Sequence, residues 1–550
     1  MRTFKYIFSL VVLFLTFHLY AQQEEVRVVK PYTPTLSGAE KIQLMPSIDD
    51  TVSYERSDLE YSIFSKRYET DFTVVPIEAA KMIKPPLEKL YKSQLKLGMG
   101  NYLTPLAELR INQVRSSKGN FGFLARHHSM NGQIRLENDQ KVAAGFNENQ
   151  LEFKGKRYTS KRTLTYNAGA NYNTYMHYGV DTLYADSVSK ENMLHDFLDA
   201  HAGIGFKSAR ADSVHLEYDG SLNYHFFTHA FNQMEHGAVL DVNAEKPFRN
   251  FRLGGDLGLS YFGHQVTWDP LLTNQFMIKI NPYLSKSTSE WMFRAGFNTY
   301  TEIRNGQVLP HFYLQGKFTF NIVKDILVPY FGIDGYEETN NYRKISNENP
   351  YIVPGLAVLP TNHKMYVYAG LKGKFTDFLA WNFRGSYSAI DDQYFYATNT
   401  NHYFENQFEV LYDDYTVINL HGEFNILPIS SLQILLKGNY FYYQMTREQY
   451  PWYQPAFDVN LRAMYNLGDK ILADAALFVI GPRYYPSLVS GGVPGELGTT
   501  VDLNLGVEYR YTKLLSFWAR LDNIIAQPYY MWYNYPSYRF RFMLGFTYGL

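Results

Sequence analysis

Hydrophobic and polar residues alternate along most of this 550-residue chain, most clearly in its last thirteen residues. From Tyr538 to Leu550 every second residue is aromatic or aliphatic, and the residues between them include two arginines and two glycines. A period of two is the period of a β-strand, whose successive side chains point to opposite faces. A strand with one apolar face and one polar face fits a wall between hydrocarbon and water, as in a transmembrane β-barrel.

The same alternation begins near Gln94 and recurs to the C-terminus. Clear examples are the segments 107–112, 251–260, 312–321, 457–466 and 501–510. We therefore expect an all-β fold, a transmembrane antiparallel outer-membrane β-barrel of about 22 strands, within a range of about 16 to 22. The barrel should occupy residues 92–550. A lumen of this width is too large for its own side chains to fill.

The connections between the expected strands alternate between short and long, which is typical of outer-membrane barrels. We expect short turns near 116–120, 160–162, 209–212, 246–249, 287–289, 323–325, 376–377, 428–430, 468–470 and 512–513. We expect long loops near 180–195, 338–362, 391–413, 485–498 and 527–536, and we assign Tyr403–Leu411 to a loop. Because the last strand should end on the periplasmic side, the short turns should be periplasmic and the long loops external.

Composition supports this interpretation. The chain holds 48 Tyr and 39 Phe, and aromatic residues make up 17% of it, which is typical of the interfacial girdles of barrels. After its first residues it has no run of about twenty apolar residues, so membrane-spanning helices are not expected. The net charge of −1 does not suggest a nucleic-acid partner. The absence of cysteine excludes disulfides, thiol catalysis, zinc–thiolate sites and a lipoprotein anchor.

The N-terminal region is expected to be separate from the barrel. Residues 1–21 have a basic start, an apolar stretch and a tolerable cleavage site, which predict a secretory signal peptide; an anchor helix is the alternative. Residues 22–91 show no sustained alternation and are interrupted by prolines, so we interpret them as a mostly irregular periplasmic extension.

Two short segments resemble known signals of outer-membrane proteins. The segment Glu25, Val26, Arg27, Val28 and Val29 resembles the extended stretch with which TonB-dependent receptors engage their energising partner. This resemblance implies a partner-binding segment, although a charged extended strand also arises by chance. A plug domain of more than a hundred residues, as such receptors carry, does not fit in the roughly seventy residues before the barrel.

The C-terminal strand is similar to the assembly signal of bacterial outer-membrane barrels. Gly545, Tyr548 and Leu550 occupy its last three defined positions. Met543 departs from the pattern at the polar position, and the last residue is Leu rather than the commoner Phe. The resemblance implies recognition by the barrel-assembly machinery during insertion.

Over most of its length the chain resembles a group of Bacteroidota outer-membrane barrels related to TonB-dependent receptors but lacking a full plug. The resemblance rests on Val28–Tyr32, on Lys89–Lys92, on Gly98–Tyr102 and on the aromatic last strand. It implies location in the outer membrane of a Gram-negative bacterium and a barrel architecture. It implies no uniform function.

No group of residues has a spacing that would form a catalytic site on β-strands, so we do not expect an enzyme or a cofactor. The chain lacks a nucleophile elbow, a P-loop and a dinucleotide-binding fingerprint. His225, His229 and His236 invite a metal-site hypothesis. His225 and His229, however, would lie about 13 Å apart on one face of a strand, which is too far for one ion. We therefore expect no metal site.

Charged residues of both signs gather on the inner faces of the closing strands. Because adjacent strands place opposite charges within reach, we expect either a selectivity lining, a latch for an inserted segment, or salt bridges that stiffen the wall. The members of this expected lumen charge cluster are Glu508, Arg510, Arg520, Asp522, Arg539 and Arg541.

The expected long loops are rich in aromatic residues. Flat amphipathic side chains of this kind stack on sugars or bury against a protein, but they also form the outer interfacial girdle. The residues in question are Tyr394, Phe395, Tyr396, Tyr403 and Phe404 in one loop, and Tyr529, Tyr530, Trp532, Tyr533 and Tyr535 in another.

These observations leave two functional hypotheses. The first is passage of a solute or polymer across the outer membrane through the lumen, either passive or gated by a partner. The second is a non-transporting subunit of an outer-membrane assembly or export complex. The expected partners are outer-membrane lipid, the barrel-assembly machinery and a periplasmic or outer-membrane protein bound through residues 22–91.

Overall fold

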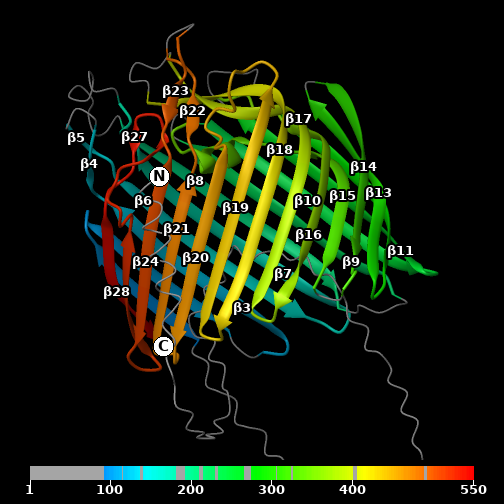
Figure 1. Cartoon of the computed structure of the whole chain (residues 1–550), viewed down its shortest axis with the longest axis horizontal. Coiled ribbons are helices and arrows are strands. Elements are labelled where there is room, and N and C mark those ends of the chain that lie inside the picture. The colour runs from blue at the N-terminus through cyan, green and yellow to red at the C-terminus, as the bar shows by residue number, and fades with distance from the viewer. Residues whose placement is uncertain are drawn as a thin grey trace, which may run out of the picture. The chain divides into compact units, whose positions relative to one another are not determined.

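The computed structural model describes residues 92–113, 116–136, 140–180, 193–209, 215–229, 233–265, 274–304, 306–323, 326–400, 406–488 and 492–550. Among these residues, 22 strands form one sheet (Figure 1). In the first half they are β1 (Ser93–Gly100), β2 (Thr104–Asn112), β3 (Gly119–Met130), β6 (Phe146–Tyr158), β7 (Arg162–Met176), β8 (Leu194–Ser208), β9 (Glu217–His229), β10 (Gln233–Phe248), β11 (Phe251–Gln265), β12 (Gln275–Ser287) and β13 (Trp291–Arg304). In the second half they are β14 (Gln307–Phe320), β15 (Val328–Glu338), β16 (Thr361–Thr376), β17 (Leu379–Thr398), β18 (Phe408–Ile429), β19 (Leu432–Met445), β20 (Phe457–Leu467), β21 (Ile471–Ile480), β24 (Thr500–Arg510), β25 (Leu515–Asp522) and β28 (Arg541–Gly549).

Each of these strands pairs antiparallel with the next one along the chain, and the last strand returns to the first. In this closing pair, Leu95 of β1 lies opposite Tyr548 of β28, and the amide of Leu550 donates to the carbonyl oxygen of Ser93 at 2.8 Å. A sheet closed in this way has no free edge, as a sheet in hydrocarbon requires. The expected all-β barrel is confirmed, at 22 strands.

The two ends of the barrel differ as the turn pattern predicts. Two consecutive strands flank each predicted short turn, and these strand ends meet at one end of the barrel, which we name the turn end and which is at the bottom of Figure 1. The other end, the loop end, carries the long connections. Where the structure describes them, these connections contain the helix α3 (Tyr342–Glu348) and three hairpins. The hairpins are β4 (Gln133–Arg135) with β5 (Lys141–Ala143), β22 (Arg483–Tyr485) with β23 (Gly495–Leu497), and β26 (Tyr530–Trp532) with β27 (Tyr535–Pro536).

One expected loop is wrong. The segment 391–413 is mostly strand, because β17 runs on to Thr398 and β18 already begins at Phe408. The assignment of Tyr403–Leu411 to a loop therefore fails from Phe408 onward, while residues 401–405 lie outside the described part of the chain. The two strands extend into this segment because the last residues of β17 and the first residue of β18 pack against other loops.

The two faces of the wall have the predicted character. On the outer face, Leu253, Phe312 and Leu314 are exposed, as a lipid-facing surface requires. On the inner face, Arg294 lies 3.1 Å from Asp256 in an ion pair that crosses between strands. None of the described helices is long and apolar enough to span a membrane.

The closing pair of strands depends on two glycines. A Cβ atom at Gly98 would lie 2.4 Å from the ring of Trp518, and one at Gly545 would lie 2.3 Å from the same ring and 2.1 Å from the carbonyl oxygen of Leu97. Both glycines therefore leave room for the indole, which is buried and lies below the ammonium group of Lys96 at 4.8 Å. We name this arrangement of Gly98, Gly545 and Trp518 the seam.

The backbone ladder is shortest between β14 and β15. These strands share only four residue pairs, from Gly316 with Ile333 to Thr319 with Tyr330, whereas β13 and β14 share fourteen. Toward the loop end, side chains replace the missing ladder. Asn298 of β13, for example, donates to the carbonyl oxygen of Gly335 at 2.8 Å.

The predictions for the N-terminal region concern residues that the structure does not describe. The signal peptide 1–21, the extension 22–91 and the possible partner-binding segment Glu25–Val29 all lie outside the described residues. They stay predictions.

Candidate functional site

The loop end is filled by a packed body, which we name the loop cap. It consists of the described residues within 131–145, 176–180, 339–360, 394–411, 446–456, 481–499 and 523–538. Apolar residues from all of these segments belong to one buried cluster, which also includes Phe197 and Phe227 of the inner wall. The long loops therefore share a hydrophobic core of their own.

The centre of the loop cap is as buried as the core of a soluble domain. Tyr342, Ile345, Ile352 and Phe408 are all 0% exposed. Burying one such side chain stabilises a fold by about 1.5–3 kcal/mol. The cap is therefore a folded element and not a set of independent loops.

Local sequence signals set the two ends of α3. Asn341 caps its N-terminus, because the side-chain oxygen accepts from the amide of Lys344 at 2.7 Å. The helix ends at Glu348, with Asn349 as its C-cap, and Pro350 follows. A helix of seven residues is not stable alone, so its packing must hold it.

One side of α3 is bonded to the inner wall of β8, β9 and β10. The amide of Tyr342 donates to Glu235 at 2.7 Å, and its hydroxyl lies 3.0 Å from Nδ1 of His229. Arg343 binds both carboxylate oxygens of Asp199, at 2.9 and 2.8 Å. Paired contacts of this kind fix orientation as well as distance.

The other side of α3 is bonded to β17. The carboxylate of Glu348 accepts from the hydroxyl of Tyr394 at 2.7 Å and from that of Tyr396 at 3.0 Å. The hydroxyl of Tyr396 also lies 3.3 Å from the carbonyl oxygen of Ile345. The helix therefore bridges two separate parts of the barrel wall.

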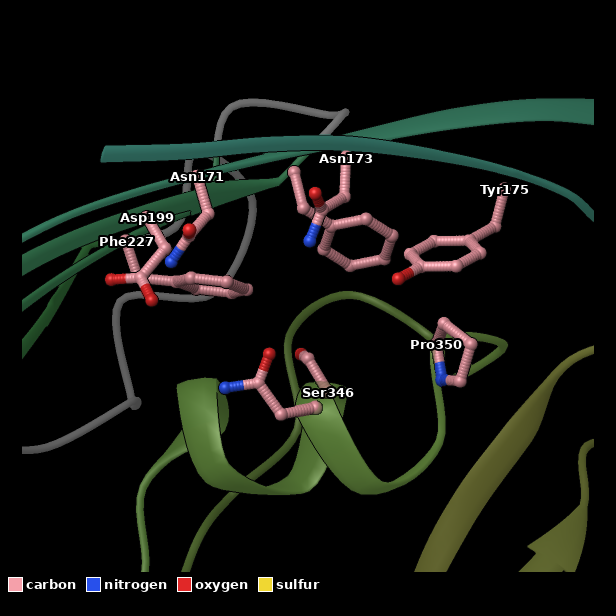
Figure 2. Close-up of a pocket in the computed structure, with 9 residues that line it drawn as sticks. Asn171, Asn173, Tyr175, Asp199, Phe227, Ser346 and Pro350 are labelled. Carbon is pink, nitrogen blue, oxygen red and sulfur yellow. The ribbon is translucent and has the colours of Figure 1, made fainter. Parts of the chain in front are cut away.

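A small cavity remains between α3 and the inner wall. Figure 2 shows Ser346 pointing from the helix toward Asn171, Asn173 and Asp199 on β7 and β8, with Tyr175 beside them. Its lining of amides, a carboxylate and aromatic rings suits water or a polar group. It lies between residues of the cap and residues of the inner wall.

Three tyrosines join the remaining loops: Tyr178 and Tyr535 are buried, and Tyr351 is partly buried. The rings of Tyr351 and Tyr535 stack with centroids 3.7 Å apart, and Tyr178 donates to the carbonyl oxygen of Pro536 at 3.0 Å. Burial raises the pKa of all three phenols, of Tyr178, Tyr351 and Tyr535, above the ordinary value. The cap therefore favours their neutral forms.

Four of the aromatic loop residues lie in the core of the cap. Tyr394, Phe395, Tyr396 and Tyr535 are buried inside the cap, so they form neither an interfacial girdle nor an open stacking surface. Tyr530, Trp532 and Tyr533 pack against the same core. Tyr529 bonds to Asp502, and Tyr403 and Phe404 lie outside the described residues.

The structure brings together only part of the expected lumen charge cluster. Arg520 lies 2.8 Å from Asp522, and Arg541 reaches the same carboxylate at 3.8 Å. Glu508 and Arg510 lie nearer the turn end, opposite Trp518 and Ser516 of β25. Arg539 precedes β28 and lines a groove beside the β4–β5 hairpin.

The residues of the expected assembly signal lie on both faces of β28. Tyr548 and Leu550 are exposed on the outer face, whereas Gly545 lies at the seam on the inner face. Gly545 thus has a packing role in the folded barrel. Its role as a recognition signal stays a prediction.

The three histidines considered for a metal site do not converge. His225 lies 2.9 Å from Glu235, His229 bonds to Tyr342, and His236 bonds to the hydroxyl of Tyr224 at 2.7 Å on the outer face. Reasoning from sequence missed a different group. Among the described residues, Glu302, His311 and Glu337 have ligand atoms close enough to hold one metal ion. They come from three strands, so no spacing in the sequence marks them.

No protein-family model matches the chain, and no curated protein matches its sequence. Solved structures do match its fold. The ferric-catecholate import receptor Fiu of Escherichia coli K12 superposes with a TM-score of 0.61 at 10% identity, over 84% of this chain and 82% of that one. The siderophore receptor PirA of Acinetobacter baumannii gives 0.63 at 8% identity, over 84% and 81%. The pyoverdine outer-membrane receptor FpvA of Pseudomonas aeruginosa gives 0.62 at 11%, over 85% and 79%. At these identities the likeness shows the fold alone: this chain has a closed 22-strand barrel like those of the matching receptors.

Proposed function

We propose that this protein is an outer-membrane barrel through which a polar solute or polymer passes, and that the loop cap is its gate. The observation that carries this proposal is the contrast between a wall lined with polar side chains and a buried apolar core at one end of it. A wide polar lumen provides a path, whereas the packed cap closes that path at rest. Similar folds belong to import receptors, and their barrels share this architecture.

The interactions that hold the cap define how it opens. Release of α3 breaks the contacts of Arg343 with Asp199 and of Tyr342 with Glu235 and His229. It also exposes Ile345 and Ile352, which are fully buried. Together these contacts keep the gate closed, so a partner or a bound solute has to supply free energy to open it.

We place the protein in the outer membrane of a Gram-negative bacterium, among Bacteroidota barrels that lack a full plug. In this proposal residues 22–91 dock a periplasmic or outer-membrane partner, with Glu25–Val29 as the contact segment. Outer-membrane lipid covers the apolar outer face, and the barrel-assembly machinery recognises the C-terminal strand. The protein is not an enzyme in this proposal.

A second function is favoured by the same closed cap. A barrel whose loop end is sealed by a hydrophobic core also suits a non-transporting subunit of an outer-membrane assembly or export complex. In that case the cap is a rigid surface that supports a bound partner, and it does not open. The two functions differ in whether removal of the cap reveals a conducting path.

Single-channel conductance separates them. The mature full-length protein in planar bilayers should be silent or should open rarely. A variant with residues 341–358 replaced by a short Gly-Ser linker should show a steady pore, because the helix and its bonds to the wall are gone. Retained β content and heat-dependent migration on gels would confirm that the variant still forms a barrel.

A crosslink across the gate provides the matched control. Since the chain has no native cysteine, Arg343→Cys with Asp199→Cys supplies two thiols, one on α3 and one on β8, that a bifunctional thiol-reactive reagent with a cleavable spacer can join. With the crosslink in place this double variant should stay closed, and cleavage of the spacer should raise its open probability above that of wild type. If the deletion variant remains silent although folded, passage is excluded and the subunit function stands.

A further inference from the structure

The group formed by Glu302, His311 and Glu337 has the geometry of a metal site. The residues lie on the neighbouring strands β13, β14 and β15, and one ligand atom from each lies within 4.8 Å of the other two. Ligand atoms of a tetrahedral zinc ion are about 3.4 Å apart. Small side-chain rotations therefore bring the three atoms into coordinating positions.

The charge of the group is not balanced by the residues around it. Glu302 and Glu337 are 3% and 7% exposed, and Asp392 adds a third negative charge that acts on both. Arg304 is the cation beside them, with Nε 3.2 Å from Oε1 of Glu302, but that oxygen accepts no hydrogen bond. Asp392 is also within reach of a second cation, Arg447. With His311 neutral, the two buried carboxylates of Glu302 and Glu337 therefore face one positive charge, that of Arg304, and negative charge remains in excess. A divalent cation carries the charge that is needed.

Hydrogen bonds behind the group hold His311 and Glu337 in position. The amide nitrogen of Asn362 lies 3.4 Å from Nδ1 of His311. The hydroxyl of Tyr313 lies 2.7 Å from the amide oxygen of Asn362 and 2.9 Å from the carboxylate of Glu337. Nε2, the other ring nitrogen of His311, faces Glu337 at 3.9 Å.

The group also lies where the barrel wall is weakest. His311 is on the part of β14 that has no ladder to β15, and Glu337 is on the facing part of β15. An ion held by both side chains would tie the two strands together where backbone hydrogen bonds are missing. Glu337 also directly precedes the segment that leads into α3, so the ion would stabilise the stem of the loop cap.

From these four observations we propose that Glu302, His311 and Glu337 bind one divalent transition-metal cation, of the zinc class, in the inner wall below the loop cap. One imidazole nitrogen and two carboxylate oxygens are ligands that Zn²⁺ accepts, with water in the fourth position. Asn362 and Tyr313 orient the ligands from behind. The site is independent of whether the lumen conducts.

The competing explanation needs no metal. A protonated His311, together with Arg304, would neutralise the two buried carboxylates as an ion-pair network. In that case the group would not distinguish Zn²⁺ from a hard cation such as Mg²⁺.

Calorimetric titration of the detergent-solubilised full-length protein with Zn²⁺, after removal of metals by a chelator, tests the proposal. We expect one site per chain. Glu302→Gln, Glu337→Gln and His311→Ala should each weaken binding by at least about tenfold, and Asn362→Ala by about tenfold through its effect on His311. Glu508→Gln, a lumen carboxylate near the turn end, is the control and should bind Zn²⁺ as wild type does.

Co²⁺ provides a reading that does not depend on the variants. Its visible absorption in the wild-type protein should indicate four-coordinate nitrogen and oxygen ligation, and Zn²⁺ should displace it. The proposal is overturned if wild type binds no Zn²⁺, if binding is unchanged in all ligand variants, or if Mg²⁺ competes equally. Should a ligand variant fail to insert, an octahedral Co²⁺ spectrum in wild type would overturn it as well.

Discussion

The turn end and the loop end of this barrel are built from the same chain by different rules. At the turn end, consecutive strands are joined by a few residues, and side chains simply alternate between lumen and lipid. At the loop end, segments that are hundreds of residues apart in sequence share one buried core. Tyr178 and Pro536, for example, are hydrogen-bonded across 358 positions.

Because of this difference, the wall and the loop cap should respond differently to substitutions. The wall is fixed by local alternation and by the requirement that each backbone group be bonded in hydrocarbon. The loop cap is fixed by tertiary packing, which depends on the particular residues that meet. A change in the wall should therefore affect whether the barrel forms, and a change in the cap should affect how it works.

The largest effect should come from a charge on the lipid face. Leu222 lies in the middle of β9 and is exposed on the outer face, while its neighbour Asn223 faces the lumen. Leu222→Arg should destabilise the barrel by about 2–4 kcal/mol, because the guanidinium must enter hydrocarbon. Asn223→Arg should cost far less. Urea unfolding in lipid vesicles measures both, and equal losses would contradict the assignment of faces.

The seam should give the next largest effect. Gly545→Ala places a Cβ atom against Trp518 and against the backbone of Leu97, so we expect a loss of about 1–3 kcal/mol in barrel stability. A Cβ atom at Gly98 would contact mainly the indole. Adding Trp518→Ala should therefore restore the stability of Gly98→Ala more fully than that of Gly545→Ala. Gly438→Ala, where the nearest atom would be 3.7 Å away, is the control for the loss of a glycine. Indistinguishable unfolding curves for Gly545→Ala and Gly438→Ala would refute the role of the seam.

A smaller and local effect is expected in the cap. Arg343→Ala leaves the carboxylate of Asp199, which is only 6% exposed, without its bidentate partner. The cap should lose about 1–2 kcal/mol, while the barrel keeps its stability. Faster hydrogen exchange of the α3 amides, with unchanged exchange in β8, would show this. Arg249→Ala in a short turn should change neither, and a general loss of protection would contradict a separable cap.

The smallest effect per group should come from pH. The raised pKa of Tyr178, Tyr351 and Tyr535 means that the closed cap favours the neutral phenols. Their contribution to the stability of the closed cap is complete below the ordinary tyrosine pKa near 10. It is lost as the pH rises through the raised pKa values of the closed cap. At pH 10 the closed cap should already have lost about 0.4 kcal/mol of stability for each of these tyrosines. Exchange of α3 amides, corrected for intrinsic rate, should therefore rise between pH 9 and pH 10, and Tyr351→Phe should reduce that rise.

The fold could be predicted from sequence because each strand of the wall has the same two surroundings. Lipid outside and water inside impose the same alternation on each strand, so Phe251 and Leu505 obey one rule although they are far apart. The short turns followed from interruptions of that rule. The error at β17 and β18 arose because Tyr394 and Phe395 leave the lipid-facing pattern to pack in the cap.

The candidate sites could not be predicted in the same way. Arg343 and Asp199 are 144 positions apart, and nothing in either local sequence indicates their contact. Glu302, His311 and Glu337 share a site only because three strands pair in one particular register. The lumen charges were partly foreseen, since Arg520, Asp522 and Arg541 lie on adjacent strands near the seam.

The pairing of β1 with β28 has a consequence for biogenesis. The first strand can acquire its second neighbour only after more than four hundred residues of intervening chain have been translocated. Contacts of such long sequence separation form slowly, so a nascent chain must keep an unsatisfied edge for most of its synthesis. Any truncation before β28 would leave this edge permanently open, and periplasmic chaperones would have to shield it from aggregation.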